Sequence, residues 1–470
     1  MSERHDAVVG RSFLKLGVGE ALARLIAFAA TVYLARLLGP GVYGVIVLAM
    51  AILLYANCIT ESGIDMLGVH DIARDQQRLD VLLPSYLGAR LLVAVVLILL
   101  LAGAGLLFFP QPEGAVLAGY AFLLLPLALG ARWVHLGLEQ SGKAALARVL
   151  AEGLSATLIV VLIHGPGDVG RAPLAQLLGE SAGAFLLLRL LGKRRVALRM
   201  SLRLDTILTL WRRSWPVVAH ILLGLLIFNS DFLFLRVYLG SATLGYYAVA
   251  YTLVSFFLNL GGSYEMSLLP AITRLSPRPE EQRKLYGSAL AQVFAGALPI
   301  AVGGSLLAGQ LVTLVFGAAY ASAVTPLRIL VWCVPIALFR NVAQAALIAH
   351  GRQQQMFRTT AWAAGVNVAL NATLIPSWGM AGAAAITVLT EVVRTGLALR
   401  LSRLVGFRLP SPRRFWRSLL AAGVMAAVVG LSGVRPVWLS VATGAAVYGL
   451  TLVLVGGLKL QRRALPELTV

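Results

Sequence analysis

The chain has 470 residues, of which 59% are hydrophobic and 13% are charged, and its mean hydropathy is +0.83. Soluble proteins carry about 25% charged residues, so this composition excludes a disordered chain and argues against a set of soluble domains. The net charge of +20 leaves two classes, a nucleic-acid-binding protein and a membrane protein with basic loops.

Fourteen apolar runs, separated by short links rich in Gly, Pro and Arg, predict fourteen membrane-spanning helices. Each span needs about 20 apolar residues, so no room is left for a large soluble domain. The runs are continuous, whereas the strands of a transmembrane β-barrel alternate, and we therefore expect an all-α polytopic membrane protein. The predicted spans in chain order are residues 12–38, 42–64, 84–109, 115–138, 145–164, 172–191, 215–238, 242–267, 286–316, 322–349, 355–376, 379–402, 418–434 and 437–457.

The basic residues gather on one side of this predicted topology. Of the 40 Lys and Arg, 32 lie at the two termini, in the links after even-numbered spans, or at the helix ends beside them. Four lie in the opposite links, and four lie within spans, namely Arg24, Arg132, Arg328 and Arg340. Cytoplasmic loops carry the excess of Lys and Arg in membrane proteins. The pattern therefore places both termini in the cytoplasm and explains the charge without nucleic acid.

Short patterns recur in the same order 200 to 209 residues further along the chain. Six predicted helices separate the two copies, and an even number gives both copies the same orientation. We therefore expect two six-helix lobes, an N-lobe at residues 1–200 and a C-lobe at 201–405, followed by two accessory helices at 406–470. Folds of this kind bind substrate between the lobes and alternate access by rocking. The recurring pairs are Arg11-Ser12 with Arg213-Ser214, Arg36 and Gly39 with Arg236 and Gly240, Ile72-Ala-Arg74 with Ile272-Thr-Arg274, and Pro126 and Arg132 with Pro335 and Arg340.

Two stretches carry a resemblance to a known family. Arg11-Ser12-Phe13 with residues 31–44 (TVYLARLLGPGVYG) resembles the start of bacterial polysaccharide-repeat-unit flippases of the Wzx type. Residues 133–143 (WVHLGLEQSGK) resemble the segment that closes the fourth helix of that family. These flippases belong to the multidrug/oligosaccharidyl-lipid/polysaccharide exporter superfamily, whose members also include drug–cation antiporters and lipid II flippases.

The resemblance implies a substrate and a location. The substrate would be an oligosaccharide on undecaprenyl pyrophosphate, such as an O-antigen, capsule or exopolysaccharide repeat unit. It would move from the cytoplasmic to the periplasmic leaflet of the bacterial inner membrane by alternating access. The implied partners are this lipid-linked oligosaccharide, membrane lipids, and the polymerase and assembly proteins of polysaccharide biosynthesis, including lipopolysaccharide biosynthesis.

Charged residues inside a membrane are costly, so each is a functional hypothesis. Glu20 and Arg24 are spaced i, i+4, which predicts either an intrahelical ion pair or a substrate-binding pair. We favour binding for Arg24, because guanidinium suits phosphate. Arg132 and Arg340 recur at matching places in the two lobes and predict a cationic vestibule for the pyrophosphate. The alternative is that both side chains extend to the lipid headgroups.

A second set of polar residues predicts an ion-coupling site in the C-lobe. Asp231 has no cation within one helical turn, Asn367 and Asn371 share one face of the next-to-last lobe helix, and Thr387 lies on the last. Carboxylate, amide and hydroxyl oxygens suit a monovalent cation, and the lipid II flippases resemble this arrangement with a sodium site from the same three helices. We expect coupling to Na⁺ or to H⁺ at Asp231. The alternative is that these residues only hold helices together.

Three more glutamates lie within predicted spans. Glu152 has Arg148 four residues before it, and Glu391 has Arg394 three residues after it, so we expect two local ion pairs. Glu180 has no local partner and is expected to pair with an arginine of another helix in the N-lobe.

The sequence contains no Walker motif, no His-Glu-x-x-His motif and no acid pair in an extramembrane loop. We therefore expect a transporter and not an enzyme, with no cofactor and no metal beyond the monovalent cation. A small-molecule cation antiporter on the same fold is the first alternative, although the two extra helices and the arginines favour a lipid-linked anion. A membrane-embedded glycosyltransferase or polymerase is the second, which the short outward links disfavour.

Overall fold

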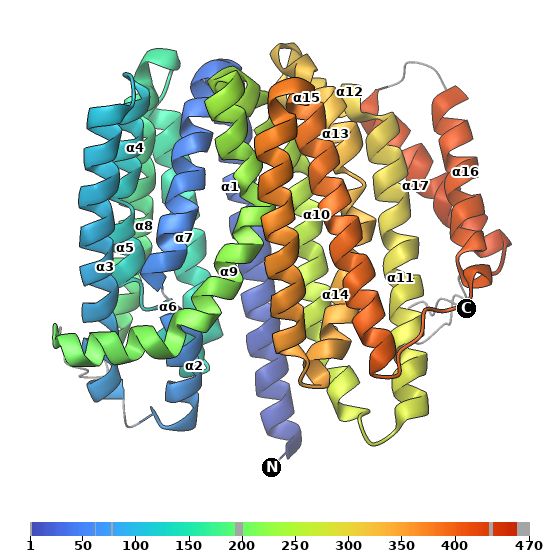
Figure 1. The fold of residues 1–470 in the computed structure, drawn as a ribbon, viewed down its shortest axis with the longest axis horizontal. Helices are drawn as coiled ribbons and strands as arrows, with labels where there is room; N and C mark the ends of the chain where they lie inside the picture. The colour runs from blue at the N-terminus through green and yellow to red at the C-terminus, as the bar shows by residue number, and fades with distance from the viewer. Residues whose placement is uncertain (1, 62, 77–78, 193–200, 432–435, 458–470) are drawn as a thin grey trace. The chain divides into compact units, whose positions relative to one another are not determined.

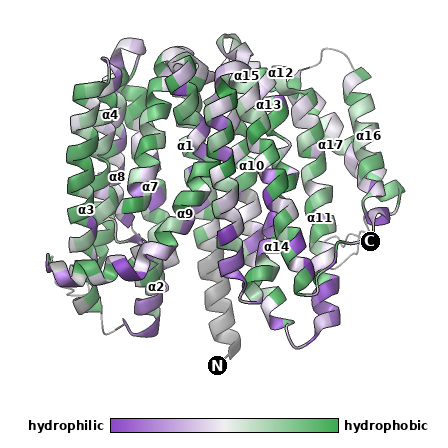
Figure 2. Cartoon of the chain, viewed as in Figure 1, coloured by the Kyte–Doolittle hydropathy of each residue, from purple (hydrophilic) through white to green (hydrophobic). Residues whose placement is uncertain are grey.

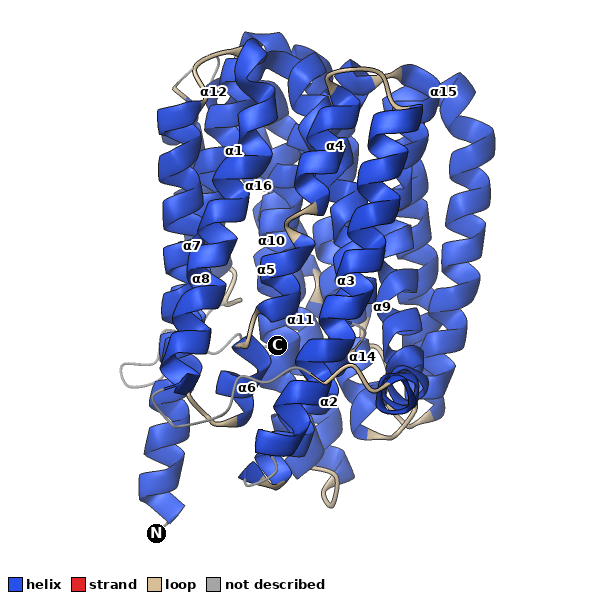
Figure 3. Ribbon diagram, turned by 90° about the vertical axis from the view of Figure 1, so that its left-hand side faces the viewer, coloured by secondary structure: helices blue, strands red, loops and turns tan. Residues whose placement is uncertain are grey.

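The computed structural model describes residues 2–61, 63–76, 79–192, 201–431 and 436–457. Every regular element in these ranges is a helix (Figure 3), so the predicted all-α class is confirmed. The chain divides into two compact units, Met1–Leu225 and Leu226–Val470. The predicted lobe boundary at residue 200 lies outside the described residues, and the domain boundaries of the sequence stay predictions.

Within the described residues, eleven helical segments are long and apolar enough to cross a membrane. Two of these, Leu16–Arg74 and Gln353–Leu404, contain a non-helical glycine, Gly39 and Gly379, where the chain turns between two predicted spans. The shorter apolar helix Trp416–Leu431 lies within one more predicted span, residues 418–434. These segments match the fourteen predicted spans, and the chain is a multi-pass membrane protein. Figure 2 shows hydrophobic residues along α3 and α16 and hydrophilic residues near the start of α11.

Unit 1 contains the helices that enclose the first candidate site. Tyr86 and Trp133 pack at the centre of its core, with ring centroids 5.2 Å apart. Figure 1 shows the first turns of α9 lying across the other helices of this unit, where Ile207 and Leu210 enter the same core. Its elements are α1 (Ser2–Glu61), α2 (Ile64–Arg74), α3 (Leu79–Phe108), α4 (Glu113–Ala121), α5 (Leu124–Leu129), α6 (Arg132–Gly137), α7 (Ser141–Leu162), η2 (Pro166–Arg171), α8 (Ala172–Gly192) and the first part of α9 (Leu204–Leu239).

Unit 2 contains the remainder of α9 and the helices of the second candidate site. α14 packs against α10, α11 and α15, and the C-terminal pair α16 and α17 packs on α11. Its further elements are α10 (Ser241–Arg274), α11 (Pro279–Leu306), α12 (Ala308–Phe316), η3 (Ala318–Ala323), α13 (Val324–Leu330), α14 (Cys333–Ala349), α15 (Gln353–Leu404), η4 (Pro412–Arg414), α16 (Trp416–Leu431) and α17 (Val437–Leu454).

The predicted repeat is visible in the backbone of the two units. Gly39 has φ 71° and ψ 170°, and Gly240 has φ 86° and ψ 175°. This left-handed φ is open to glycine and strained for residues with a Cβ. The two glycines therefore make the same turn, between the first and second spans of each predicted lobe.

Two predicted spans are interrupted instead of continuous, and the cause is the same in both. α4 ends at Ala121 and α5 begins at Leu124, just before Pro126, while α13 ends at Leu330 and α14 begins at Cys333, just before Pro335. A proline lacks the N–H group and its ring clashes with the carbonyl four residues earlier. In both units a bond between residues three apart takes the place of the lost bond between residues four apart. The Leu125 N–H donates to the Phe122 carbonyl and the Val334 N–H to the Val331 carbonyl, each at 3.1 Å.

Candidate functional site

A cavity of about 640 Å³ lies within unit 1, enclosed by α1, α2, α3, α5, α6, α7 and α8. Its size falls within the range of about 300–1,000 Å³ that is typical of ligand sites. The wall is unusually rich in charge for a membrane protein. The charged lining residues are Arg24, Arg90, Arg132, Arg148, Glu20, Glu61, Asp65, Glu152 and Glu180.

Glu20 is paired across the cavity and not along its own helix. Its Oε1 lies 2.7 Å from Nη2 of Arg132, which begins α6 just after the interruption at Gly130 and Ala131. The predicted i, i+4 pair between Glu20 and Arg24 is therefore not the pair that forms. The structure places all three of these residues on the cavity wall, while their roles in binding stay predictions.

Arg148 joins two carboxylates on neighbouring helices. Its guanidinium lies 2.6 Å from Glu152 on α7 and 3.0 Å from Glu180 on α8. The predicted local pair with Glu152 and the predicted interhelical pair of Glu180 are both confirmed. One arginine shared by two carboxylates leaves this group with a formal charge of −1.

Arg90 ties the broken fourth helix to its neighbours. Its buried guanidinium donates to Asp65 Oδ1 at 2.8 Å and to the carbonyls of Leu127 and Gly130 at 2.6 and 3.1 Å. Those carbonyls lie at the end of α5, where the last carbonyls of a helix lack their usual donors four residues ahead; the Leu127 carbonyl also accepts from the Gly130 N–H. The sequence does not single out Arg90, because a position near the end of a predicted span does not reveal an acceptor on another helix.

Arg24 differs from the other three arginines of the cavity. It is exposed on the wall and, among the described residues, has no carboxylate within ion-pair distance. Guanidinium offers a planar set of donors that matches phosphate oxygens. Arg340, the fourth residue of the predicted substrate site, lies on α14 of unit 2 instead.

Unit 2 brings together the four residues that predicted an ion site. Asp231 on α9 is fully buried, and its carboxylate accepts from the Tyr247 hydroxyl and, at 2.9 Å, from the Phe232 backbone N–H. Thr387 Oγ1 lies 3.4 Å from Asp231 Oδ2 and 3.0 Å from the Ala383 carbonyl. Among the described residues, no Lys, Arg or His forms an ion pair with Asp231. A buried carboxylate without a cation is a strong candidate for cation or proton binding.

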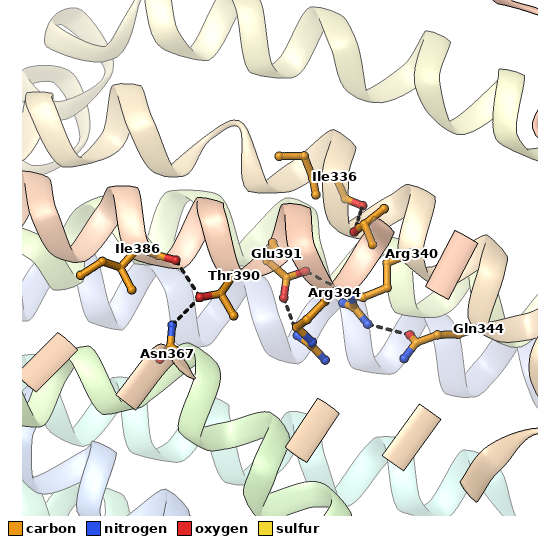
Figure 4. Close-up of polar contacts among 9 residues, drawn as sticks. Ile336, Arg340, Gln344, Asn367, Ile386, Thr390, Glu391 and Arg394 are labelled. Atoms are coloured by element: carbon orange, nitrogen blue, oxygen red, sulfur yellow. Dashed lines mark hydrogen bonds and ion pairs between the residues drawn. The ribbon is translucent and has the colours of Figure 1, made fainter. Parts of the chain in front are cut away.

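Ser230, the residue before Asp231, connects the two asparagines to this site by hydrogen bonds. Asn371 Nδ2 donates to Ser230 Oγ at 3.1 Å and to Asn367 Oδ1 at 3.0 Å, and Ser230 Oγ lies 3.2 Å from Asn367 Oδ1. Asn367 Nδ2 donates to Thr390 Oγ1 at 2.9 Å (Figure 4). Tyr247 and Thr390 were not predicted. Thr390 follows Thr387 at i+3 and could have been found, whereas nothing local marks Tyr247.

The oxygen atoms of this cluster are of the chemical types that could hold a monovalent cation. Asn371 Oδ1 is buried and has no hydrogen-bond donor among the described residues. Together with the Asp231 carboxylate and the hydroxyls of Ser230 and Thr387, it offers hard oxygen ligands only. In the described part of the chain, no group of three or more His, Cys, Asp or Glu is arranged so that it could hold a metal ion.

Arg340 lies in an ion cluster next to the Asn367–Thr390 contact (Figure 4). Its Nε lies 3.1 Å from Glu391, which also accepts from Arg394, and its Nη1 lies 2.6 Å from Gln344. The predicted Glu391–Arg394 pair is confirmed. Two arginines and one carboxylate give this largely buried group a formal charge of +1, and Arg394 also stacks over the Phe228 ring at 5.7 Å.

Comparison with known proteins agrees with this architecture. Residues 9–276, more than half of the chain, match the family described as polysaccharide biosynthesis protein. A curated relative, Probable flippase AglR of Haloferax volcanii, is 26% identical over 234 residues, which cover 47% of this chain and 49% of that protein. The chain thus matches about half the length of this relative.

Two solved structures share the fold. The lipid II flippase MurJ, in an inward closed conformation, aligns with a TM-score of 0.75 at 10% identity, covering 94% of this chain and 98% of that one. A multidrug resistance MATE family transporter of the MOP superfamily, in an inward-facing conformation, aligns with a TM-score of 0.64 at 18% identity, covering 84% and 98%. At such low identities the likeness establishes the fold alone.

Proposed function

This chain belongs to the polysaccharide biosynthesis protein family, and we propose that it is a flippase for an oligosaccharide linked to undecaprenyl pyrophosphate. The substrate moves from the cytoplasmic to the periplasmic leaflet of the bacterial inner membrane, with both termini of the protein in the cytoplasm. The protein performs transport and no covalent chemistry.

Arg24 is the observation that carries the proposal. A pyrophosphate that leaves the membrane surface needs a cationic partner, because an unpaired charge in an apolar medium costs several kcal/mol. Arg24 lines the cavity with its guanidinium free of carboxylates among the described residues. Arg132 lines the same cavity, is partly exposed, and forms an ion pair with Glu20.

The Asp231 cluster is the proposed coupling site. Cation or proton binding there neutralises a buried carboxylate that has no basic partner among the described residues. The unpartnered Asn371 Oδ1 favours Na⁺ as the coupling ion. The contact of Thr387 favours H⁺, because its own proton goes to the Ala383 carbonyl and its oxygen can then accept from a protonated Asp231. Transport measured with a sodium gradient and with a proton gradient distinguishes the two ions.

A small-molecule cation antiporter is the second candidate function. Five carboxylates and four arginines line the cavity, and this formal excess of negative charge suits a cationic solute. The flippase proposal is preferred because the carboxylates other than Glu61 are all within ion-pair distance of an arginine.

Depletion of the protein in its host tests the proposed function. Lipid-linked oligosaccharide should then accumulate in the cytoplasmic leaflet, where membrane-impermeant periodate added to spheroplasts does not oxidise it. Wild-type protein and Arg278→Ala, a change on the exposed surface of unit 2, should restore oxidation, and Arg24→Ala should not. An unchanged oxidised fraction after depletion would show that the chain does not move this substrate.

A further inference from the structure

Most charged residues of the unit 1 cavity form ion pairs, and two of them do not. Arg132 pairs with Glu20, Arg90 pairs with Asp65, and Arg148 is shared by Glu152 and Glu180. Two residues of opposite charge are left without an ion pair among the described residues, Arg24 and Glu61. Both lie on α1, on the wall of the same cavity.

Asn57, a neighbour of Glu61, has an unpartnered acceptor of its own. Asn57, one turn earlier on α1, donates from Nδ2 to Glu61 Oε1 at 3.0 Å. Asn57 Oδ1 is buried and has no donor among the described residues. A buried acceptor without a donor costs about 1–3 kcal/mol, and native structures usually satisfy such atoms with protein, water or a ligand. The pair therefore presents unpartnered acceptors to the cavity.

Acceptors of this kind cannot serve the pyrophosphate. At neutral pH the pyrophosphate is itself anionic and accepts hydrogen bonds, so the Glu61 carboxylate repels it. The donors of a lipid-linked saccharide lie on its sugars, as hydroxyl groups and amide N–H groups. A carboxylate that accepts from such donors forms a charge-assisted hydrogen bond, which is roughly twice as strong as a neutral one.

We propose that Asn57 and Glu61 form a saccharide subsite that binds the sugar next to the pyrophosphate through its hydroxyl or amide N–H groups. The proposal rests on the proposed function, in which Arg24 takes the pyrophosphate. The two subsites divide the cavity by chemistry, with a donor for the anionic group and acceptors for the sugar. A site built on hydrogen bonds strongly rejects a ligand that lacks the matching groups, so this subsite selects glycosylated carrier over bare carrier.

Equilibrium binding to two lipids tests the subsite. Purified full-length protein is titrated with undecaprenyl pyrophosphate and with the same lipid carrying one N-acetylglucosamine. Wild-type protein should bind the glycosylated lipid at least tenfold more tightly. Glu61→Gln and Asn57→Ala should each remove most of this preference, and neither should weaken binding of the bare lipid. Arg24→Ala should weaken both lipids, and Glu280→Gln, the same chemical change at an exposed site in unit 2, should weaken neither.

The outcomes separate the two proposals. Equal affinity of the wild-type protein for the two lipids, or an unchanged preference in Glu61→Gln and Asn57→Ala, would overturn the saccharide subsite and leave the proposed function standing. Failure of the wild-type protein to bind either lipid would overturn the proposed function itself. Glu61→Gln and Asn57→Ala report on the same subsite independently, so loss of folding in one, seen by size-exclusion chromatography, leaves the other to decide.

Discussion

Glu20 and Arg132 are 112 positions apart in the chain, and Glu20 Oε1 lies 2.7 Å from Arg132 Nη2. This pair joins the first half of α1 to the short helix α6 and removes Glu20 from the reach of Arg24. As a result, Arg24 keeps its full charge for a ligand. The pair also changes what each arginine variant is expected to do.

Arg24→Ala should abolish flipping and leave the protein level in the membrane unchanged, because no carboxylate loses its partner. Arg24→Lys keeps the charge but loses the planar donor set, so it should flip slowly. Immunoblots of membranes and the periodate assay measure the two effects. The double variant Glu20→Gln with Arg24→Ala should be inactive as well. Normal transport by this double variant would show that Arg24 holds no pyrophosphate.

Arg132→Ala should behave differently, since it leaves Glu20 unpaired. A charged group that loses its partner inside a protein destabilises the fold. We therefore expect a lower membrane level for Arg132→Ala and recovery of that level in Glu20→Gln with Arg132→Ala. Immunoblots of both variants make the comparison. Equal levels of the single and double variants would mean that the pair contributes nothing to folding.

The Glu391 ion cluster predicts an order of stabilities. Glu391→Gln leaves Arg340 and Arg394 as two like charges in a largely buried place, which should cost about 3–5 kcal/mol. Arg340→Gln leaves a neutral Glu391–Arg394 pair and should cost less. Glu281→Gln, in the exposed pair with Arg278, should cost below about 1 kcal/mol. Thermal unfolding in detergent gives the order, and a more stable Glu391→Gln than Arg340→Gln would contradict the charge assignment.

Asp231→Asn should reduce transport without lowering the amount of folded protein, because its amide oxygen can accept from the Phe232 N–H while its NH₂ group donates to the hydroxyl oxygens of Tyr247 and Thr387. Transport into vesicles is measured with a sodium gradient, with a proton gradient and with neither. The wild-type rate should rise with one gradient, and the variant rate should rise with none. Asp205→Asn, at the exposed start of α9, serves as the matched control. Equal gradient dependence in wild type and Asp231→Asn would make the cluster a purely structural contact.

The topology is tested with fusions. A reporter that works only in the cytoplasm should be active when fused after Val470. A reporter that works only in the periplasm should be active when inserted at Gly167, in η2. The charge distribution requires the two positions to lie on opposite sides. Activity of both reporters on the same side would refute the fourteen-span topology.

Much of the fold follows from local properties of the sequence. Apolar runs, breakers and the basic side of the topology predict the spans because each depends on neighbouring residues and on membrane thickness. The repeat of Gly39 at Gly240 was visible for the same reason, since both positions need a left-handed φ. The interruptions before Pro126 and Pro335 were missed as breaks because helix-breaking prolines are tolerated within membrane spans.

In the candidate sites, too, local spacing predicted some residues, while contacts between helices were missed. Asn367 and Asn371 share a helix face, and their spacing together with the family resemblance places them near Asp231, as the structure does. Arg90 and Tyr247 were missed because their partners lie on other helices, and no spacing rule reports a contact between helices. The predicted pair of Glu20 with Arg24 was wrong for the same reason, because Glu20 pairs with Arg132 on α6.

Reconstitution tests the central claim most directly. The purified protein is placed in liposomes that contain a fluorescent undecaprenyl-pyrophosphate-linked saccharide, and a membrane-impermeant quencher added outside reports the fraction of label in the outer leaflet. With the preferred ion gradient, wild-type protein should bring the inner-leaflet label to the quencher, and Arg24→Ala should leave it protected. Equal protection in liposomes with wild-type protein and in liposomes without protein would contradict the account.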